Sequence, residues 1–261
     1  MRITFLGTGG AFCDYRVNYQ NNAMVETSVG PVLLDCGTTA CQSLKELGVH
    51  PADLAALVLT HLHGDHGSPE QLIWERTYDG PDGEPSWKTT PIYAPPNILD
   101  PLKRALDPYV GLFIDRLGVT RDDGVAELVD AHPCRIATIG DLHVIWFPVE
   151  HLVSSRFNKP AYGLWLERAG VRVWWSGDTT FHAARVTEAA RSPGVKRLFH
   201  ECTFSPAYKD TVHTHYSELQ TLPADVRARI TLMHHTQVPP GVDVVADGFA
   251  GAADRHETID L

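Results

Sequence analysis

Short apolar runs, separated by glycine-containing turns and polar stretches, recur along the chain and predict an α/β protein. Alternating or continuous apolar positions in short segments predict strands, and apolar positions spaced by three or four predict helices. Residues 78–91 are rich in glycine and proline and predict an exposed loop. Strands are predicted at Arg2–Leu6, Ala23–Thr27, Val32–Asp35, Leu57–Thr60, His143–Phe147, Ala161–Glu167, Val171–Trp175, Arg197–His200 and Arg229–Met233, and helices at Thr38–Leu47, Asn97–Leu106, Phe181–Arg191 and Tyr216–Leu222.

The densest chemistry lies directly after one predicted buried strand. The segment His61–His66 reads HLHGDH and carries four metal-capable side chains in six residues. On an extended segment His61 and His63 point to the same side, and Asp65 and His66 follow on a turn. Imidazole nitrogen and carboxylate oxygen suit zinc, and manganese or iron less selectively. A chance polar loop explains this spacing poorly, so the segment predicts a metal site.

Three further metal-capable residues, His151, Asp178 and His234, each come shortly after a predicted strand. Strands that share a sheet bring their carboxyl ends to one edge, where α/β proteins place their chemistry. Taken alone, His151 could be a surface histidine and Asp178 a turn residue, but together they extend the cluster. A two-metal site needs several ligands for each ion and often a bridging carboxylate. We predict one ion held by His61, His63 and His151 and a second by Asp65, His66 and His234, with Asp178 bridging.

Composition narrows the class of protein. Hydrophobic residues make up 43% of the 261 positions, enough for a sizeable core. No apolar run approaches the roughly 18 residues of a membrane span, and Arg2–Leu6 looks like a strand, without the layout of a signal peptide. The five cysteines are dispersed without CxxC pairs, which favours reduced thiols in the cytoplasm. A net charge of −10 with scattered basic residues argues against a long nucleic acid as partner.

In their order and spread these motifs resemble those of the metallo-β-lactamase-fold hydrolases. The similarity lies in the HxHxDH motif at His61–His66, the later single His151, the SGDT aspartate Asp178 and the C-terminal His234, and it spans nearly the whole chain. The resemblance implies a four-layer αβ/βα sandwich that forms a single domain over residues 1–261. It also implies a metal-dependent hydrolase with two divalent ions, zinc as the first choice and manganese as the second. The resemblance is much less specific for the substrate than for the fold.

Two further segments resemble the ribonuclease Z branch of that fold. HECT at 200–203 is similar to the HEAT motif of the branch, and VHTH at 212–215 to its HST motif. In that branch the motif Glu and His handle protons at the phosphodiester, which implies Glu201 and His213 here. His215 takes the place of the last motif residue and competes with His213 for the role, and a polar loop is the bland alternative for both. Gly7–Gly10 also resembles the branch, although such a glycine cluster by itself favours a tight turn over a phosphate loop.

The interval between His151 and Asp178 departs from the ribonuclease Z enzymes that mature transfer RNA. Those enzymes carry a long protruding arm there, whereas this chain has 27 positions that predict one hairpin. The acidic net charge points the same way, because transfer RNA binding requires a basic surface. The chain therefore resembles arm-less phosphodiesterases that act on cyclic nucleotides.

The resemblance implies hydrolysis of a small phosphodiester, with a cyclic nucleotide as the preferred substrate. Metal-bound hydroxide, oriented by Asp65, would attack, and His213 held by Glu201 would protonate the leaving oxygen. The alternatives are a tRNA 3′ endonuclease of the ribonuclease Z type, a thioester or lactone hydrolase on the same site, and a non-catalytic metal-binding module. The oligomeric state is not specified by the sequence, and a homodimer is one possibility. Tyr15, Tyr19, Trp74 and Phe113 could stack a base, although packing explains each of them more simply.

Overall fold

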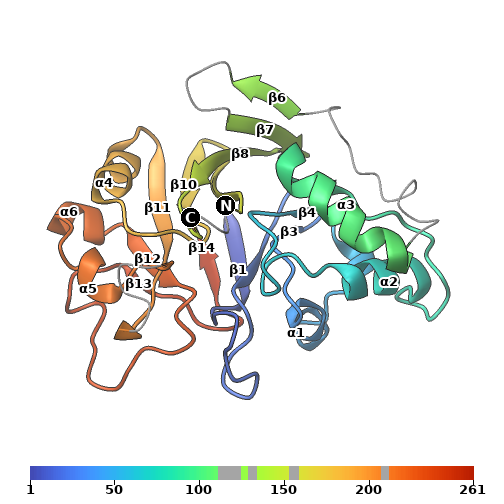
Figure 1. The fold of residues 1–261 in the computed structure, drawn as a ribbon, viewed down its shortest axis with the longest axis horizontal. Coiled ribbons are helices and arrows are strands. Elements are labelled where there is room, and N and C mark those ends of the chain that lie inside the picture. Colours follow the sequence, from blue (N-terminus) through green and yellow to red (C-terminus); the bar gives the residue numbers. More distant parts are fainter. Residues whose placement is uncertain (111–124, 129–133, 153–158, 207–211) are drawn as a thin grey trace.

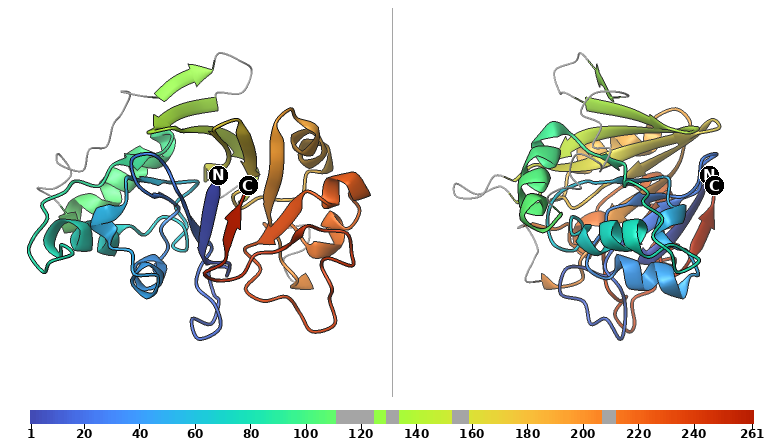
Figure 2. Two further views of the ribbon diagram at one scale, coloured as in Figure 1. Left: turned by 180° about the vertical axis from the view of Figure 1, so that it is seen from behind. Right: turned by 90° about the vertical axis from the view of Figure 1, so that its right-hand side faces the viewer.

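The computed structural model describes residues 1–110, 125–128, 134–152, 159–206 and 212–261. Within these residues two β-sheets lie face to face, and helices cover the outer face of each (Figures 1 and 2). Helices α1, α2 and α3 lie on one outer side of the molecule, and α4, α5 and α6 lie on the other. This is the four-layer arrangement that the resemblance implied.

The first sheet has the strand order β14-β1-β2-β3-β4-β5. Its strands β1, β2 and β3 are antiparallel neighbours, whereas β3, β4 and β5 run parallel. The elements of this half are β1 (Arg2–Gly7), β2 (Asn22–Val25), β3 (Val32–Leu34), α1 (Ala40–Glu46), the 3-10 helix η1 (Pro51–Asp53), β4 (Ala56–Val58), α2 (Glu70–Tyr78), β5 (Ile92–Tyr93) and α3 (Pro96–Val110), joined at the end of the chain by β14 (Thr258–Asp260).

The second sheet has the strand order β13-β12-β11-β10-β9-β8-β7-β6. From β6 to β10 neighbouring strands are antiparallel, and from β10 to β13 they are parallel. Its elements are β6 (Val125–Leu128), β7 (Cys134–Ile139), β8 (Leu142–Val149), β9 (Ala161–Arg168), β10 (Val171–Trp175), α4 (Ala183–Arg191), β11 (Val195–Glu201), α5 (Tyr216–Leu219), α6 (Ala224–Arg227), β12 (Ile230–Met233) and β13 (Gly251–Ala252).

The central strands appear in the sequence as continuous apolar runs because successive side chains point to opposite faces of the sheet and both faces are buried. In β3, Val32 and Leu34 pack between the two sheets, whereas Leu33 between them faces the helix layer of α1, α2 and α3. In β10, Trp175 lies in the central layer and Trp174 packs toward the layer of α4, α5 and α6. Because both faces of the sheets are covered at their centres, successive residues of β2, β3, β4 and β12 are all buried. The apolar runs thus reflect a sandwich with three buried interfaces.

The predicted elements are found with small shifts of their ends, and the hairpin after Ala161 forms as β9 and β10 around Ala169 and Gly170. Helices α2 and α6, the 3-10 helix η1 and strands β5, β6, β7, β13 and β14 were not predicted. Helix α2 was not predicted because its buried face includes Arg76, whose guanidinium donates hydrogen bonds to the carbonyl oxygens of Pro51 and Leu54. A buried arginine breaks the apolar stripe on which helix prediction depends.

The part of the chain that the structure describes has no helix with both the length and the apolar character needed to cross a membrane.

Candidate metal centre

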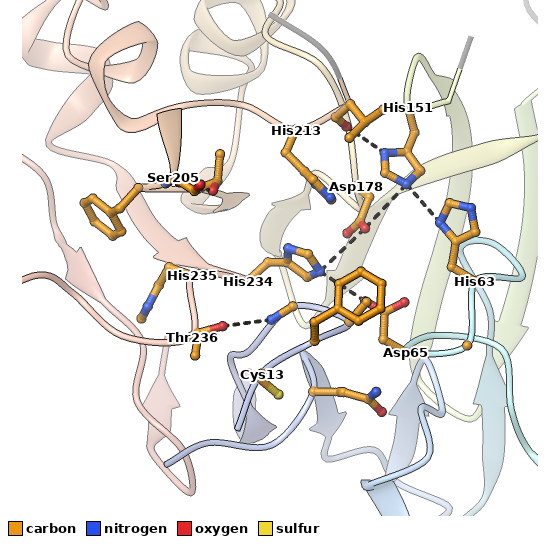
Figure 3. Close-up of a pocket in the computed structure, with 18 of the residues that line it drawn as sticks. Cys13, His63, Asp65, His151, Asp178, Ser205, His213, His234, His235 and Thr236 are labelled. Atoms are coloured by element: carbon orange, nitrogen blue, oxygen red, sulfur yellow. Dashed lines mark hydrogen bonds and ion pairs between the residues drawn. The ribbon is translucent and has the colours of Figure 1, made fainter. Parts of the chain in front are cut away.

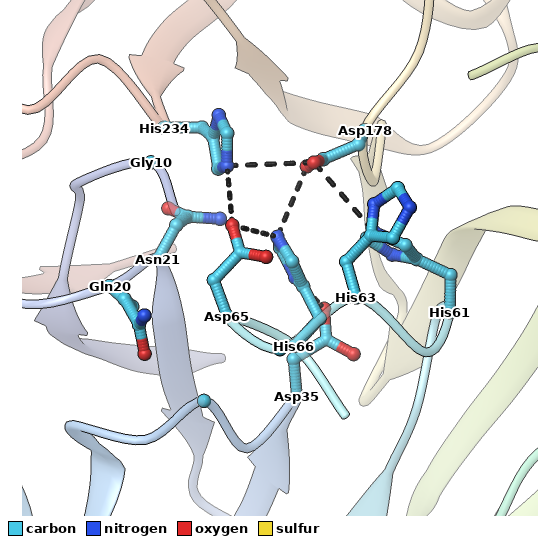
Figure 4. Close-up of polar contacts among 12 residues, drawn as sticks. Gly10, Gln20, Asn21, Asp35, His61, His63, Asp65, His66, Asp178 and His234 are labelled. Carbon is cyan, nitrogen blue, oxygen red and sulfur yellow. Dashed lines mark hydrogen bonds and ion pairs between the residues drawn. The ribbon is translucent and has the colours of Figure 1, made fainter. Parts of the chain in front are cut away.

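Seven side chains converge where the carboxyl ends of β4, β8, β10 and β12 meet, and they form two groups. Figure 4 labels six of them, and Figure 3 labels the seventh, His151. Within each group the ligand atoms lie within 4.8 Å of one another. All seven except the half-buried His63 are buried. The structure therefore brings every predicted ligand into one place. The first group is His61, His63 and His151, and the second is Asp65, His66, Asp178 and His234.

Asp178 lies between the two groups. Its Oδ2 is 3.8 Å from Nε2 of His61 and 3.7 Å from Nε2 of His151, on the side of the first group. Its Oδ1 is 3.3 Å from Nε2 of His66, and Oδ2 is 3.5 Å from Nε2 of His234, on the side of the second. A carboxylate in this position can serve two cations at once.

The donor set fits divalent cations. Nε2 of His66 and Oδ1 of Asp178 are fully buried and have no hydrogen-bond partner among the described residues, although buried polar atoms are nearly always satisfied. In the first group Nδ1 of His63 lies 3.2 Å from Nε2 of His61 and 3.0 Å from Nε2 of His151. Converging nitrogens and carboxylate oxygens of this kind are the ligand chemistry of zinc and, less selectively, of manganese.

The electrostatics of the two groups differ. Burial, together with the nearby His66, lowers the pKa of His61 well below its usual value, so His61 is neutral, the form that binds metal. Burial also opposes protonation of His66, but the carboxylates of Asp178, Asp65 and Asp35 outweigh it and raise the pKa of His66 well above its usual value. The second group therefore attracts positive charge strongly, as a cation site must.

Asp35 orients His66 from behind and was not among the predicted site residues. It follows β3, is completely buried, and adopts a positive φ of 59°. Its carboxylate accepts hydrogen bonds from the Thr60 backbone N–H, the Thr60 hydroxyl and Nδ1–H of His66, at 2.7, 2.7 and 2.8 Å. The bond to Nδ1 turns Nε2 of His66 toward the ligand cluster, as carboxylates do for metal-binding histidines. The sequence signal for this role was an aspartate at the end of a buried strand, the predicted Val32–Asp35.

Glu201 and His213 form a second polar unit beside the ligands. Glu201 ends β11 and is fully buried, and its Oε2 accepts a hydrogen bond of 2.6 Å from Nδ1–H of His213. Its Oε1 accepts the backbone N–H groups of Thr179 and Thr214. Burial disfavours protonation of His213, but the charge and hydrogen bond of Glu201 prevail and raise the pKa of His213 to about 9. His213 is therefore set up to hold a proton at neutral pH.

His215, the competing candidate, is used elsewhere. It is the N-cap of α5, where its side chain accepts the Ser217 backbone N–H while Glu218 accepts the His215 backbone N–H. This reciprocal capping box holds the start of the helix. His213, by contrast, lines the cavity in front of the ligands.

That cavity has a volume of about 790 Å³ (Figure 3). Of the three aromatic residues considered from the sequence that the structure describes, Tyr15, Tyr19 and Trp74, only Tyr15 lines it. Tyr19 is buried with Arg255 over its ring, Trp74 is on the outer side of α2, and Phe113 lies outside the described residues. The loop at 78–91 is exposed, as predicted. Lining residues that the sequence did not indicate include Phe12, Cys13, Thr38, Phe204, Ser205 and Thr236.

A His/Asp cluster at the open edge of an αββα sandwich defines a metallo-β-lactamase-fold hydrolase. Solved structures agree: YhfI from Bacillus subtilis matches with a TM-score of 0.69 at 18% identity over 99% of both chains. Human short-form tRNase Z gives a TM-score of 0.69 at 18% identity over 100% of this chain and 99% of that one. Zn²⁺-bound PqqB from Methylobacterium extorquens gives 0.68 at 16% identity over 100% of both. At these identities the likeness concerns the fold.

Sequence comparison identifies the family. The family described as Anti-Pycsar protein Apyc1 matches residues 1–259, and the chain belongs to it. Anti-Pycsar protein Apyc1 of Paenibacillus sp. (strain J14) is 30% identical over 240 residues, 90% of this chain and 89% of the relative. The protein of the same name from Bacillus phage 010DV004 is 26% identical over 248 residues, 90% of this chain and 89% of the relative. A ribonuclease Z of Mycolicibacterium gilvum (strain PYR-GCK) is 28% identical over 190 residues, 69% of this chain and 62% of the relative.

These findings confirm the predicted resemblance, the fold and the enzyme class. The protein is a metal-dependent hydrolase with phosphodiesterase activity, in a family that degrades cyclic nucleotides. The His/Asp cluster supports binding of divalent metal, and membership of this family supports action on a small phosphodiester.

Proposed function

We propose that the protein hydrolyses cyclic mononucleotides with two divalent ions, zinc in the first instance. The proposal rests on a single observation: the seven-residue ligand cluster, with Asp178 between its two groups, opens onto the same cavity as His213, which is hydrogen-bonded to Glu201. The ligand cluster would serve many hydrolases, whereas the proton-holding pair suits a substrate whose leaving group is a poorly acidic alcohol. A 3′,5′-cyclic nucleotide is such a substrate, and it is small enough for a cavity of about 790 Å³.

His61, His63 and His151 would hold one ion, and Asp65, His66 and His234 the other, with Asp178 shared. When bound, the two ions would acidify water and neutralise charge at the phosphoryl oxygens. The protein contributes the orientation of these ligands. Nδ1 of His151 contacts the backbone oxygen of Val212 at 2.7 Å, which turns Nε2 toward the site, as Asp35 does for His66.

His213 has the role of general acid in this proposal. Glu201 engages Nδ1, so Nε2 is the nitrogen that would give its proton to the leaving oxygen. The carboxylate of Glu201 is itself held by two backbone N–H groups and therefore cannot rotate away. Asp65 lies 3.3 Å from Nε2 of both His66 and His234, in position to accept a hydrogen bond from the attacking water as well as to bind metal.

A substrate panel tests the function directly. Zinc-loaded and manganese-loaded protein should hydrolyse cyclic nucleotides and bis-p-nitrophenyl phosphate, leave thioesters and lactones largely intact, and lose activity in chelator. Faster turnover of a thioester or lactone than of any cyclic nucleotide would contradict the proposal, because acyl transfer does not need the Glu201–His213 pair.

Two further parts of the proposal concern the setting of the enzyme. Four of the five cysteines, Cys13, Cys36, Cys41 and Cys202, are buried free thiols, which supports a reducing compartment such as the cytoplasm. Residues from both sheets share one central core, which supports a single domain over 1–261. Sedimentation of the purified protein will decide between monomer and homodimer.

A further inference from the structure

Phe12 is the most exposed large hydrophobic residue among the described residues, at 94% exposure, and it lines the cavity that contains the metal ligands. Exposing a phenyl ring to water is unfavourable, and such rings are mostly buried in proteins. Single exposed apolar residues are common on protein surfaces, so the relevant observation is where this one lies: Phe12 is at the edge of the candidate substrate cavity, where a bound ligand would cover its ring. None of the described aromatic rings stacks on Phe12 in the structure.

The loop that carries Phe12 is held firmly at its base. The Cys13 N–H donates to the Gly10 carbonyl oxygen at 3.1 Å and closes a tight turn with Phe12 at its tip. The Gly10 N–H donates to the Thr236 hydroxyl at 3.2 Å, next to the metal ligand His234. The turn is thus tied to the ligand cluster, and Phe12 keeps a defined place relative to it.

Asn18 adds a second anchor to the same loop. Its side-chain amide donates to the Thr8 hydroxyl at 2.8 Å and to the Thr236 carbonyl oxygen at 2.7 Å, and its Oδ1 accepts the Thr8 N–H. Asn18 is buried, so these bonds are shielded from water. A ring on a fixed turn loses little entropy when it binds a ligand.

The other aromatic residues of the cavity are already engaged. The Phe204 ring packs on Tyr216 and on His235, with ring centroids 4.8 and 6.2 Å apart. The Tyr15 hydroxyl is 3.5 Å from the Thr38 hydroxyl, and Tyr15 is 50% exposed. Phe12 therefore presents the larger uncovered aromatic surface.

We propose that the nucleobase of the substrate stacks on Phe12 while the cyclic phosphate occupies the metal centre. This inference rests on the proposed function and names the residue that recognises the base. Stacking on an aromatic face suits every base, because each base has a π-face. It also explains why a phenyl ring that contributes nothing visible to the core lies at the edge of this cavity.

The test separates the base from the diester. Steady-state kinetics of zinc-loaded wild type, Phe12→Ala and Phe12→Tyr are measured on a 3′,5′-cyclic nucleotide and on the matching 1-O-methylribose 3′,5′-cyclic phosphate, which has no base. Phe12→Ala should raise KM for the nucleotide by roughly 5- to 150-fold, the effect of losing one base–aromatic stack, with kcat nearly constant. The loss should be confined to the substrate that carries a base, and Phe12→Tyr should restore KM.

Trp87→Ala is the matched control, because Trp87 is 61% exposed and does not line the cavity. It should leave both substrates unaffected. Equal KM changes for Phe12→Ala on both substrates, or no change on either while wild type cleaves the nucleotide, would overturn the base-stacking role. If wild type cleaves neither substrate, the proposed function itself has failed.

Discussion

Nδ1–H of His213 donates a 2.6 Å hydrogen bond to Oε2 of Glu201, and the same carboxylate oxygen lies 3.7 Å from Nδ1 of the proposed metal ligand His234. One buried carboxylate therefore touches both the proposed acid and the proposed metal site. Its other oxygen is held by backbone N–H groups of two separate segments. Glu201 links the proton-handling residue to the metal ligands in a fixed geometry.

Replacing His213 by alanine should leave both metal ions bound and lower kcat for a cyclic nucleotide by about 10²–10⁴-fold, the usual range for general acid–base catalysis. The loss should be smaller for bis-p-nitrophenyl phosphate, because p-nitrophenolate departs without a proton. Steady-state kinetics and elemental analysis of the same preparation measure both effects. A silent His213→Ala on a cyclic nucleotide would place the acid elsewhere.

His215→Ala is the control for that experiment. Its side chain caps α5, so the variant should lose about 1 kcal/mol of stability, the usual value of an N-cap, and keep most of its activity. Thermal unfolding and kcat are compared with those of His213→Ala. If His215→Ala is the more damaging change to kcat, the two histidines have exchanged roles.

The pH profile should show the influence of Glu201 on His213. A general acid must be protonated, and the pKa of His213 is raised to about 9, so kcat should stay high at neutral pH and fall as pH rises through the region near 9. Glu201→Gln removes the negative charge and should move this alkaline limit downward, toward the ordinary histidine value near 6.5. Bound cations lower the alkaline limit of wild type and of Glu201→Gln alike. The measured quantity is therefore the difference between the two alkaline limits. An alkaline limit that is the same in Glu201→Gln and wild type would show that this limit does not report the ionisation of His213.

The number of metal ions bound per chain should depend on Asp178. Elemental analysis of loaded wild type should give two ions per chain, and Asp178→Ala should lose them stepwise because Asp178 contacts both ligand groups. One ion in carefully loaded wild type would contradict the two-metal proposal.

Asp35 provides a subtler metal test. Asp35→Asn removes the charge behind His66 and should weaken the second ion by about 10–100-fold, as loss of such supporting carboxylates does. Asp141→Asn is the matched control, because Asp141 is a surface residue paired with Arg168. Metal titration should find wild-type affinity in the control. Equal affinities in Asp35→Asn and wild type would show that Asp35 serves only the fold.

Substrate size should follow from charge and from the short interval between His151 and Asp178. The protein should cleave small cyclic diesters and show little 3′ processing of precursor transfer RNA at physiological salt, because a net charge of −10 disfavours the binding of a long polyanion. Both reactions can be followed with one enzyme preparation. Efficient trimming of transfer RNA would reverse this interpretation.

The sequence by itself determined the fold class, and it predicted the seven residues that the structure brings together at the candidate metal centre. HLHGDH at 61–66 has a spacing that few structures other than a metal site explain, and the later His151, Asp178 and His234 each follow a strand. Period-two and continuous apolar runs were sufficient to locate most central strands, because these strands are buried on both faces. Local patterns of this kind can be recognised in the amino-acid sequence alone.

Only the tertiary structure decided which residues support the ligands and which shape the cavity. Asp35 and His66 are 31 positions apart and meet because β3 and β4 are parallel neighbours. Helix α2 was hidden because Arg76 finds its hydrogen-bond partners outside its own helix. Phe12 looks like an ordinary apolar residue in the chain, and its exposure at the cavity edge emerges only when the turn is tied to Thr236, 226 positions after Gly10. Such roles depend on contacts between distant segments, which local patterns do not encode.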